Sequence, residues 1–519
     1  MDDIRIWYVG EKSAVWQIVD LWKQYPNVPP KQLEGRLSTT GGNYAAIMED
    51  GDKVLGVVDK IRSYPIFYFQ KGSEFAISNS ARKLREELDL DEIDDMSLLE
   101  FCMAAYVTGR ETLYKDLYQI QAGEYVFWNQ TIESLCRKRY YLFLGKKYRE
   151  DDEEELIEEL DERTNRVFLR VIEQTKGDPI WVALSGGLDS RLVLCKLKQI
   201  GCQELRAFSY GAPGNYEAKI AKEVAEKVGV EWCFVPLGMR EARRFFHSEE
   251  RRKYWSFADG LSVVPNMQDI APLLKLFAGK KLQESSVIVN GQSGDFITGG
   301  HIPAYFLDGG KDLSLLFRRA IEKHYSQWLS LLSQENIGRV TNKIRAAIGA
   351  PEGEKIDGQR LSSLYELWEW QERQCKYVIN GQRIYDYLGL KWILPLWDDD
   401  YLTYWEEIPL NMKFSQRLYK RYLEKYDFFG CFRNFKREVW RWPGVTIAVV
   451  PVARMVRVLF GRKCSEMFYH YFKYIGHYRH FYAPYGLRNY VKFASKIRGS
   501  VALDIDTWIN ENLNQRIFG

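Results

Sequence analysis

The stretch WVALSGGLDSR, residues Trp181–Arg191, decides the fold of the larger part of this 519-residue chain. It overlaps a short apolar run, Pro179–Leu184, of the kind that forms a buried parallel strand. Apolar residues then recur at helical spacing over Leu188–Ile200, and the pattern stops at Gly201, a residue favoured immediately after a helix. The residues between these two runs are therefore predicted to turn the chain from a strand into a helix.

Strands and helices continue to alternate after this turn. The run ELRAFSYG (Glu204–Gly211) predicts a second strand, and NYEAKIAKEVAEKVGVEWCFVPL (Asn215–Leu237) predicts a helix followed by a third strand. Such alternation is typical of a parallel sheet with right-handed crossovers. Ligands of these sheets bind beyond the carboxyl ends of the strands, where the quoted turn is expected to lie.

The residue types in the turn favour a polyphosphate bound together with a metal ion. Gly186 and Gly187 let the backbone approach a ligand and direct N–H groups toward it, and the helix N-terminus adds positive potential. Ser185 and Ser190 can donate hydrogen bonds. Asp189 would repel phosphate unless a cation lay between them, so its presence predicts Mg²⁺. The Gly-Lys-Ser/Thr ending of a P-loop is missing, so this is not a P-loop.

The turn resembles the pyrophosphate-binding loop of the N-type ATP pyrophosphatases, which form adenylated intermediates. Within that group, VNGQSGDFITGGHIP (Val289–Pro303) resembles the second Mg-pyrophosphate motif of the asparagine synthetases, G-E-G-A-D-E-x-x-G-G-Y. The residues that match this motif are Gly291, Asp295, Gly299 and Gly300. The residues that depart from it are Gln292, Phe296 and His301, where the family has Glu, Glu and Tyr.

Three further stretches resemble the same family in the same order: VLGVVDKIRSYPIFYF, TLYKDLYQIQAGEYVFW and YLGLKWILPLWDDDYL, so the resemblance runs from Gly42 to Phe435. It implies that a carboxylate attacks the α-phosphate of ATP, giving an acyl-AMP and pyrophosphate. Ammonia or an amine would then displace AMP and form an amide. ATP and Mg²⁺ are the cofactors that this chemistry implies.

The resemblance also implies roles for individual residues. Asp189 and Asp295 would hold Mg²⁺ and act in catalysis, and Lys436, beside Arg433 and Arg437, would face the departing pyrophosphate. The residues implied to bind the nucleotide are Leu184, Ser185, Gly186, Gly187, Asp189, Ser190, Phe208, Ser209, Tyr210 and Gly291.

Residues 1–148 predict a separate α+β domain. NYAAIMEDGDKVLGVVD reads as a hairpin that turns at Asp50-Gly51, and SLLEFCMAAYV reads as a helix capped by Ser97. By resemblance this is a class II glutaminase-like domain, a truncated Ntn-hydrolase-like fold, whose nucleophile is a cysteine directly after the initiator methionine. Residue 2 is Asp, and the first cysteine is Cys102. We therefore expect a degenerate domain without glutaminase activity that supports the second domain.

The second domain is predicted to span residues 149–430, an α/β parallel-sheet synthetase domain of the adenine nucleotide α-hydrolase type, with helical C-terminal additions. It opens with the acidic stretch REDDEEELIEELDERTNRVFLRVIEQ (149–174). Leu156, Leu160, Val167 and Val171 recur there at helical spacing, and the acidic residues crowd the first turns, where the helix dipole favours negative charge. An ordinary helix is therefore predicted.

Residues 431–519 form a basic, aromatic extension. Between residues 431 and 500 there are 14 Lys or Arg against Glu438 and Glu466, beside an apolar stretch at Val445–Phe460. This composition suits an anionic membrane surface, a soluble anionic substrate such as a nucleotide-linked sugar, or a plain solvated basic face. Nucleic acid is not expected, because no recognition motif is present.

The composition of the whole chain limits the kinds of site and the cellular location that can be expected. The formal net charge is only +3, and the eight cysteines are scattered, which disfavours a zinc site or a disulfide framework. No signal peptide and no run of 18 apolar residues is visible, so a cytoplasmic location is expected, with peripheral attachment at the inner face of the membrane left open.

Two classes of function remain open. The first is an ATP-dependent, amide-forming ligase that uses a sugar acid of a surface polysaccharide or another carboxylate. Its nitrogen donor would be free ammonia, a separate glutaminase or a substrate amine. The second is a catalytically inactive binding or regulatory protein, favoured by Gln292 and Phe296. Within the ligase class, an intramolecular ligase similar to β-lactam synthetases or lasso-peptide cyclases is a further alternative.

Overall fold

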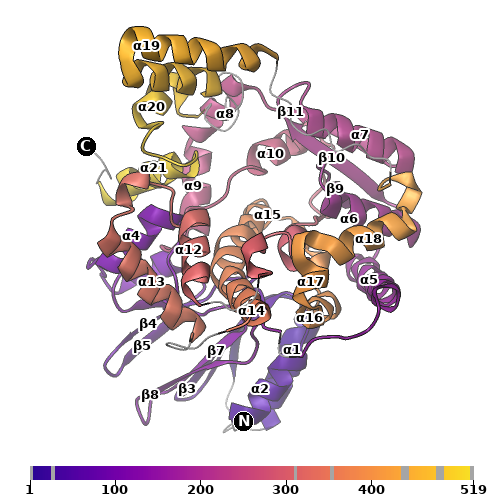
Figure 1. Cartoon of the computed structure of the whole chain (residues 1–519). Helices are drawn as coiled ribbons and strands as arrows, with labels where there is room; N and C mark the ends of the chain where they lie inside the picture. The colour runs from indigo at the N-terminus through magenta and orange to yellow at the C-terminus, as the bar shows by residue number, and fades with distance from the viewer. Residues whose placement is uncertain are drawn as a thin grey trace.

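A computed structural model of the chain describes residues 4–24, 30–145, 147–308, 312–350, 356–433, 444–474 and 484–514. Antiparallel sheets of the N-terminal part lie at one end of the molecule, and a parallel sheet flanked by helices lies to one side (Figure 1). The helices α19 (Gly444–Lys473) and α20 (Gly486–Phe493) lie at the end opposite the N-terminal sheets, whereas α21 (Val501–Leu513) lies beside α4 (Asp95–Ala104) (Figure 1).

The N-terminal part contains two antiparallel sheets, with strand orders β1-β2-β3-β7-β8 and β5-β4-β6. The strands are β1 (Arg5–Gly10), β2 (Tyr44–Asp50), β3 (Lys53–Val58), β4 (Phe67–Lys71), β5 (Glu74–Ser78), β6 (Leu117–Gln119), β7 (Glu124–Asn129) and β8 (Ser134–Arg139). The predicted hairpin is confirmed: Asp50 pairs with Lys53, and Gly51 has a φ of 59°, which glycine adopts without strain.

Helices cover the outer faces of the two sheets. They are α1 (Lys12–Gln24), α2 (Pro30–Thr39), α3 (Ala81–Glu87) and α4 (Asp95–Ala104). On β2, Ala46 and Met48 pack toward α1 and α2, whereas Ala45 and Ile47 pack toward the second sheet, as the alternation of side chains along a strand requires. The result is a helix–sheet–sheet–helix sandwich, which confirms the α+β class.

The start of α4 differs from the prediction. Asp94, not Ser97, caps the helix, and its side chain accepts a hydrogen bond from the Ser97 N–H. Glu100, three residues after Ser97, is fully buried and accepts a hydrogen bond from the Thr108 N–H (3.4 Å). Two overlapping cap patterns are present in the sequence, and burial of Glu100 favours the earlier one.

The second part opens with α5 (Glu153–Thr175), as predicted, with acidic residues in its first turn and a buried apolar stripe. The five-stranded sheet has the order β11-β10-β9-β12-β13, and every pair in it is parallel. Its elements are β9 (Ile180–Ala183), α6 (Leu188–Gln199), β10 (Leu205–Gly211), α7 (Tyr216–Val228), β11 (Glu231–Pro236), β12 (Val287–Val289) and β13 (Lys391–Ile393). The predicted parallel α/β sheet is confirmed.

The remaining helices surround this sheet and connect it to the N-terminal part. They are α8 (Met239–Phe246), α9 (Glu249–Ala258), α10 (Ile270–Ala278), α11 (Gly294–Ile297), η1 (Ala304–Phe306), α12 (Ser314–Lys323), η2 (Leu329–Leu331), α13 (Gln334–Ile348), α14 (Gly358–Trp368), the π-helix η3 (Glu369–Val378), η4 (Ile379–Gln382), α15 (Arg383–Tyr387), η5 (Pro395–Trp397), α16 (Asp399–Glu407), α17 (Leu410–Lys413), η6 (Phe414–Gln416), α18 (Arg417–Tyr426) and η7 (Phe428–Gly430).

The C-terminal additions are helical, as expected: α19 (Gly444–Lys473), α20 (Gly486–Phe493) and α21 (Val501–Leu513). Trp508 of α21 packs on Phe101 of α4 and donates to Asp259, which also pairs with Arg82 of α3. One continuous core therefore joins α4 of the N-terminal part to the parallel sheet and to α21. Within the described residues, no helix is both long enough and apolar enough to cross a bilayer.

Candidate active site

The predicted pyrophosphate loop connects β9 to α6 at the carboxyl end of the parallel sheet. The Ser185 N–H donates to Ser190 Oγ (3.1 Å), the Gly187 N–H donates to Ser185 Oγ (3.1 Å), and the two hydroxyl oxygens lie 3.1 Å apart. The two serines thus close the turn on itself. Gly187 is the N-cap of α6 and has no side chain to accept from the first N–H groups, which suits them to an anion.

The second motif packs directly against this loop. A Cβ added to Gly291 would lie 2.6 Å from the carbonyl carbon of Asp189, and one added to Gly294 would lie 2.5 Å from Asp189 Cγ. A larger residue at Gly291 would displace the loop backbone, and one at Gly294 would displace the side chains of Asp189 and Leu396. Because β9 and β12 are neighbouring parallel strands, the structure brings together the segments that carry Asp189 and Asp295, as predicted.

Asp295 begins a row of charged side chains that reaches into the core. Its Oδ1 accepts from the Phe296 N–H (2.9 Å), and its Oδ2 lies 3.1 Å from His301 Nε2. His301 Nδ1 lies 2.5 Å from Glu369 Oε1, and Glu369 is fully buried on the π-helix. Lys323 Nζ also lies 3.2 Å from this carboxylate.

Asp295, His301 and Glu369 hold one another in their charged forms. Burial alone would lower the pKa of His301, but the charge of Glu369 and the hydrogen bonds to Asp295 and Glu369 raise it to about 9. Burial would raise the pKa of Glu369, but the charge and hydrogen bond of His301 place it well below its ordinary value. The pKa of Asp295 is lowered because the His301 hydrogen bond outweighs burial. Asp295 is therefore an ionised carboxylate, with 57% of its side chain exposed.

These carboxylates suit Mg²⁺ shared with a substrate. Mg²⁺ in nucleotide sites is held by one or two carboxylates together with phosphate oxygens and water. The described residues contain no cluster of three or more His, Cys, Asp or Glu that could hold a metal without a substrate. Asp189 and Asp295 would hold the ion on the protein side, and the ion would neutralise phosphate charge there.

The predicted nucleotide-binding residues of β10 serve partly structural roles. Ser209 donates to the Leu184 carbonyl (2.6 Å) and accepts from the Trp232 indole (2.9 Å). The Phe208 side chain is fully buried against Trp181, so it faces the core. The Tyr210 hydroxyl donates to Asp269. These contacts fix β10 against the loop, and nucleotide binding by these three residues stays a prediction.

Two of the three departures from the family motif, Gln292 and Phe296, are accommodated in the fold. The Gln382 amide donates to Gln292 Oε1 and accepts from Asn290 Nδ2 (2.9 Å), so the half-buried Gln292 joins an amide network with two buried residues. Phe296 is 1% exposed and packs between Phe143 and Trp397. An acidic side chain at position 296 would be buried among aromatic rings. The family's two glutamates are thus replaced by a neutral amide and a core residue.

Sequence reasoning missed residues that support both motifs. Arg191, 3% exposed, donates to the Gly186 carbonyl (3.0 Å) and to the Cys431 carbonyl (2.7 Å). The π-helix supplies Glu369 and Gln374, whose amide oxygen accepts from Ser293 Oγ (2.7 Å). The only sequence signal for these π-helix residues is the placement of acidic and amide residues among the tryptophans of ELWEWQERQ.

The π-helix also reaches the N-terminal part. Glu372 accepts from the Gly109 N–H (3.0 Å), and Lys376, which pairs with Glu372 at 2.5 Å, donates to the Val107 carbonyl (3.0 Å). Both side chains are buried. The same ten residues therefore contact the second motif on one side and the loop after α4 on the other.

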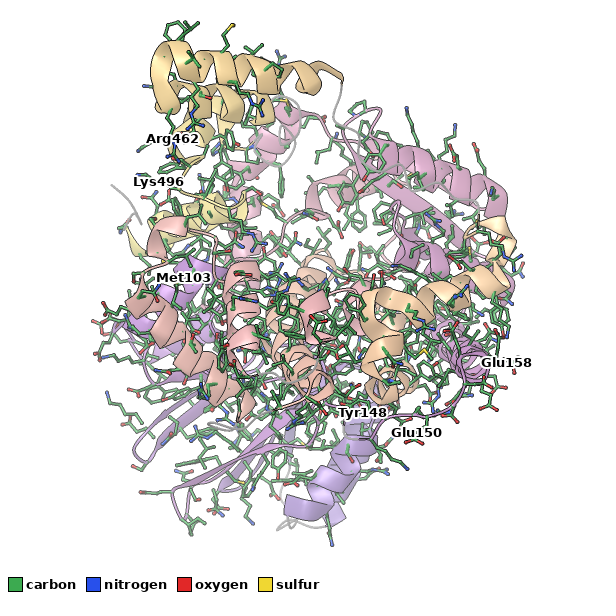
Figure 2. The ribbon with its side chains drawn as sticks, in the orientation of Figure 1. Met103, Tyr148, Glu150, Glu158, Arg462 and Lys496 are labelled. Carbon is green, nitrogen blue, oxygen red and sulfur yellow. The ribbon has the colours of Figure 1, made fainter. Side chains whose placement is uncertain are left out.

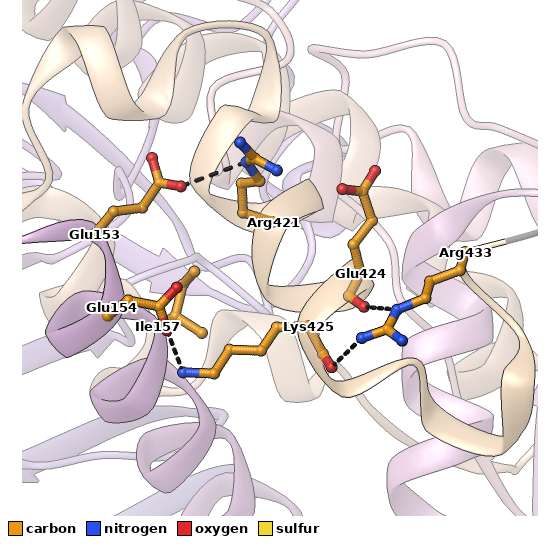
Figure 3. Close-up of a pocket in the computed structure, with 7 residues that line it drawn as sticks. All are labelled: Glu153, Glu154, Ile157, Arg421, Glu424, Lys425 and Arg433. Carbon is orange, nitrogen blue, oxygen red and sulfur yellow. Dashed lines mark hydrogen bonds and ion pairs between the residues drawn. The ribbon is translucent and has the colours of Figure 1, made fainter.

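Lys436 and Arg437 lie outside the described residues. Arg433 is described, and its guanidinium donates to the carbonyls of Glu424 (2.6 Å) and Lys425 (3.0 Å) at the end of α18. It lines a pocket of about 530 Å³ between α5 and α18 (Figure 3). That pocket is lined by ion-paired side chains of both signs, such as Lys425 with Glu154 (2.5 Å), and it includes neither motif.

Comparisons with known proteins support one family. No curated protein matches the chain. Two solved structures are similar over part of their length, each at 10% identity. Glutamine phosphoribosylpyrophosphate amidotransferase from B. subtilis, complexed with ADP and GMP, is matched over 57% of both chains with a TM-score of 0.16. A structure described as the allosteric regulatory enzyme of purine biosynthesis is matched over 55% of this chain and 54% of its own, with a TM-score of 0.18.

The matched region thus spans little more than half of those two structures, and so distant a likeness carries no argument about this chain. The family model for asparagine synthase matches residues 171–426, which include both phosphate motifs, all five strands of the parallel sheet and the π-helix. Residues 171–426 are therefore an asparagine synthase domain, the domain of an ATP-dependent, amide-forming ligase family.

Proposed function

We propose that the protein adenylates a carboxylate with ATP and converts the acyl-AMP into an amide, releasing pyrophosphate and AMP. The observation that carries this proposal is the contact between the pyrophosphate loop and the second motif. Gly291 and Gly294 leave just enough room for Asp189, so two ionisable carboxylates come from neighbouring strand ends.

The residues present suggest how the steps would be divided. The N–H groups at the start of α6 and the hydroxyls of Ser185 and Ser190 would hold the β- and γ-phosphates. The substrate carboxylate would then form a bond to the α-phosphorus while the bond to the bridging oxygen of pyrophosphate breaks. Phosphoryl-type transfer of this kind needs charge neutralisation and positioning rather than covalent help from the protein. The amine would next attack the acyl carbon, lose a proton and expel AMP.

In our proposal, the basic composition of residues 431–500 indicates a substrate that carries phosphate as well as a carboxylate. A sugar acid carried on a nucleotide or lipid phosphate would bring both a carboxylate and negative charge, and 14 Lys or Arg lie between residues 431 and 500. Amidation of such an acid serves surface polysaccharides, and its ATP would come from the cytoplasm. The nitrogen donor would be ammonia, a partner glutaminase or an amine of the substrate.

A second candidate is a binding or regulatory protein without catalysis. It is favoured by the neutral Gln292 and by Phe296, since neither acidic side chain of the family motif is present. A third form, an intramolecular ligase, shares the adenylation step and differs only in where the amine comes from.

Release of pyrophosphate from ATP is the decisive experiment. Purified protein would be screened with Mg²⁺ against sugar acids and other carboxylates, with and without ammonium or amines, and products would be identified by mass spectrometry. Pyrophosphate and AMP formed with a single acid class would support the ligase. ATP binding with no pyrophosphate from any substrate pair would favour the inactive candidate.

We also predict that the isolated protein does not hydrolyse glutamine. The described N-terminal part has Cys102 and Cys136 as its cysteines. Burial raises the pKa of Cys102 to about 12, so its thiolate, the nucleophilic form, is scarcely populated at neutral pH. Glutamate release would be measured in parallel with amide formation, with Cys102→Ala as the matched variant. Glutamate formed at the rate of amide formation would contradict the prediction.

A further inference from the structure

The helix α19 is not one rod but two arms that fold back on each other. Gly461 leaves helical geometry with φ 83° and ψ 174°, and Ser465 Oγ donates to the Ala453 carbonyl (2.6 Å) across twelve residues. We call α19 with this turn the tail hairpin (Gly444–Lys473). It lies at the end of the molecule opposite the N-terminal sheets (Figure 1).

The base of the tail hairpin is anchored to the rest of the protein. Tyr474, which follows the second arm, packs against Tyr490 of α20 with ring centroids 5.2 Å apart. Immediately before α20, the Pro484 carbonyl lies 3.3 Å from His247 Nε2, at the end of α8. The hairpin is therefore held at its base by contacts with α20 and α8.

The turn of the tail hairpin exposes consecutive apolar side chains. Val458, Leu459 and Phe460 are 85%, 64% and 68% exposed, directly before Gly461. Val452 and Met455, at 36% and 56%, continue the same exposed stripe as Leu459 at positions i, i+3 and i+7 of the first arm. In a soluble protein such a stripe normally packs against a core, so an exposed contiguous one marks a contact surface.

Basic side chains border this apolar stripe. Arg454 and Arg457 are exposed one turn apart on the first arm, and Arg462, 78% exposed, follows the turn (Figure 2). The hairpin contains one acidic residue, Glu466, which pairs with Arg462 at 2.7 Å. Guanidinium groups beside an apolar edge match a surface of phosphate head groups above acyl chains.

We propose that the turn of the tail hairpin docks on an anionic lipid bilayer. Val458, Leu459 and Phe460 would enter the head-group region while the neighbouring arginines contact lipid phosphates. This inference rests on the exposed surface alone and is independent of the ligase reaction. It makes the contact peripheral and reversible, because no described helix spans a bilayer. Of the options that the basic extension left open, it assigns the membrane to the residues of the tail hairpin alone.

Vesicle sedimentation of the full chain tests the proposal. Wild-type protein should pellet with vesicles of equal parts phosphatidylglycerol and phosphatidylcholine at low salt, remain free with phosphatidylcholine alone, and be released at high salt. Arg454→Glu/Arg457→Glu should weaken the partition coefficient by more than 20-fold, since each basic contact contributes about fivefold. Leu459→Ser/Phe460→Ser should weaken it at least tenfold at the same salt.

Matched controls separate the hairpin from general effects of charge and exposure. Ile132→Ser removes a side chain that is 68% exposed, as Phe460 is, in the turn between β7 and β8. Lys83→Glu/Lys222→Glu reverses two exposed basic residues on α3 and α7. Because both control sites lie outside the proposed contact, the partition coefficient of each control variant should stay within about twofold of the wild-type value. Equal sedimentation of the hairpin and control variants would overturn the proposal.

A second copy of the chain is the competing occupant of the surface. Light scattering without vesicles should give the monomer mass for wild type at concentrations where it sediments with lipid. A dimer that is lost in Leu459→Ser/Phe460→Ser would assign the stripe to self-association and overturn membrane docking. Free inorganic phosphate should not compete with vesicles, whereas competition by it would assign the arginines to a soluble anion.

Discussion

Asp189→Asn is expected to lower the rate of pyrophosphate release by about 10²–10³, the loss seen when a principal electrostatic stabiliser is removed. The substitution keeps the size of the side chain, so the close contact with Gly294 is preserved while the negative charge is lost. Asp295→Asn should have an effect of the same order, because it removes the second carboxylate at the strand ends. Initial rates at saturating ATP and Mg²⁺ measure both.

Asp20→Asn, an exposed position on α1, is the matched control and should retain the wild-type rate. Circular dichroism and thermal unfolding would establish that each variant is folded. Wild-type rates in either site variant would remove that aspartate from the proposed metal site. A rise in the Mg²⁺ concentration needed for half-maximal rate would support the metal role specifically.

Glu369→Ala is expected to lower the free energy of unfolding by about 3–5 kcal/mol, the cost of breaking a buried ion pair from one side. Glu369 is fully buried, and its removal leaves His301 and Lys323 beside an uncharged cavity. Urea unfolding at neutral pH would measure the loss. Glu335→Ala, at an exposed position of α13, should change the value by less than about 0.5 kcal/mol.

The pH dependence of this loss has a defined sign. The pKa of His301 is raised from 6.5 to about 9, so its contribution is complete below pH 6.5 and disappears as the pH rises through 9. The pKa of Glu369 is lowered from 4.5, so its contribution is complete above pH 4.5 and disappears in more acidic solution. The difference between wild type and Glu369→Ala should be largest between these limits. A difference that is constant up to pH 10 would contradict the ion pair.

The elements of the site that depend only on neighbouring residues in the sequence were predicted correctly. The loop at Ser185–Ser190, the helix after it and the acidic helix α5 each depend on residues within one or two turns, and all three are confirmed. The fit of Gly291 and Gly294 against Asp189 depends on two strands pairing. The family motif pointed to Gly291 but not to Gly294, and only the pairing of β9 with β12 shows that both glycines lie against Asp189.

The contact between the π-helix and the second motif could not be predicted from local sequence patterns. Glu369 is 68 residues from His301 in sequence, and its role depends on a π-helix that no spacing of apolar residues distinguishes from an α-helix. The predicted cap of α4 was wrong because Asp94 and Ser97 both fit a cap pattern, and the structure uses Asp94, while Glu100 is buried against Thr108.

The π-helix restricts how the length of this chain can change. Its hydrogen bonds span five residues, so deletion of one residue would let the stretch relax toward an α-helix and change which of its side chains face each neighbour. Gln374 would then leave Ser293, and Lys376 would leave the Val107 carbonyl, in a single step. Insertions and deletions are thus excluded from Glu369–Val378. The N-terminal half is fitted to this segment and could be exchanged for a foreign domain only together with it.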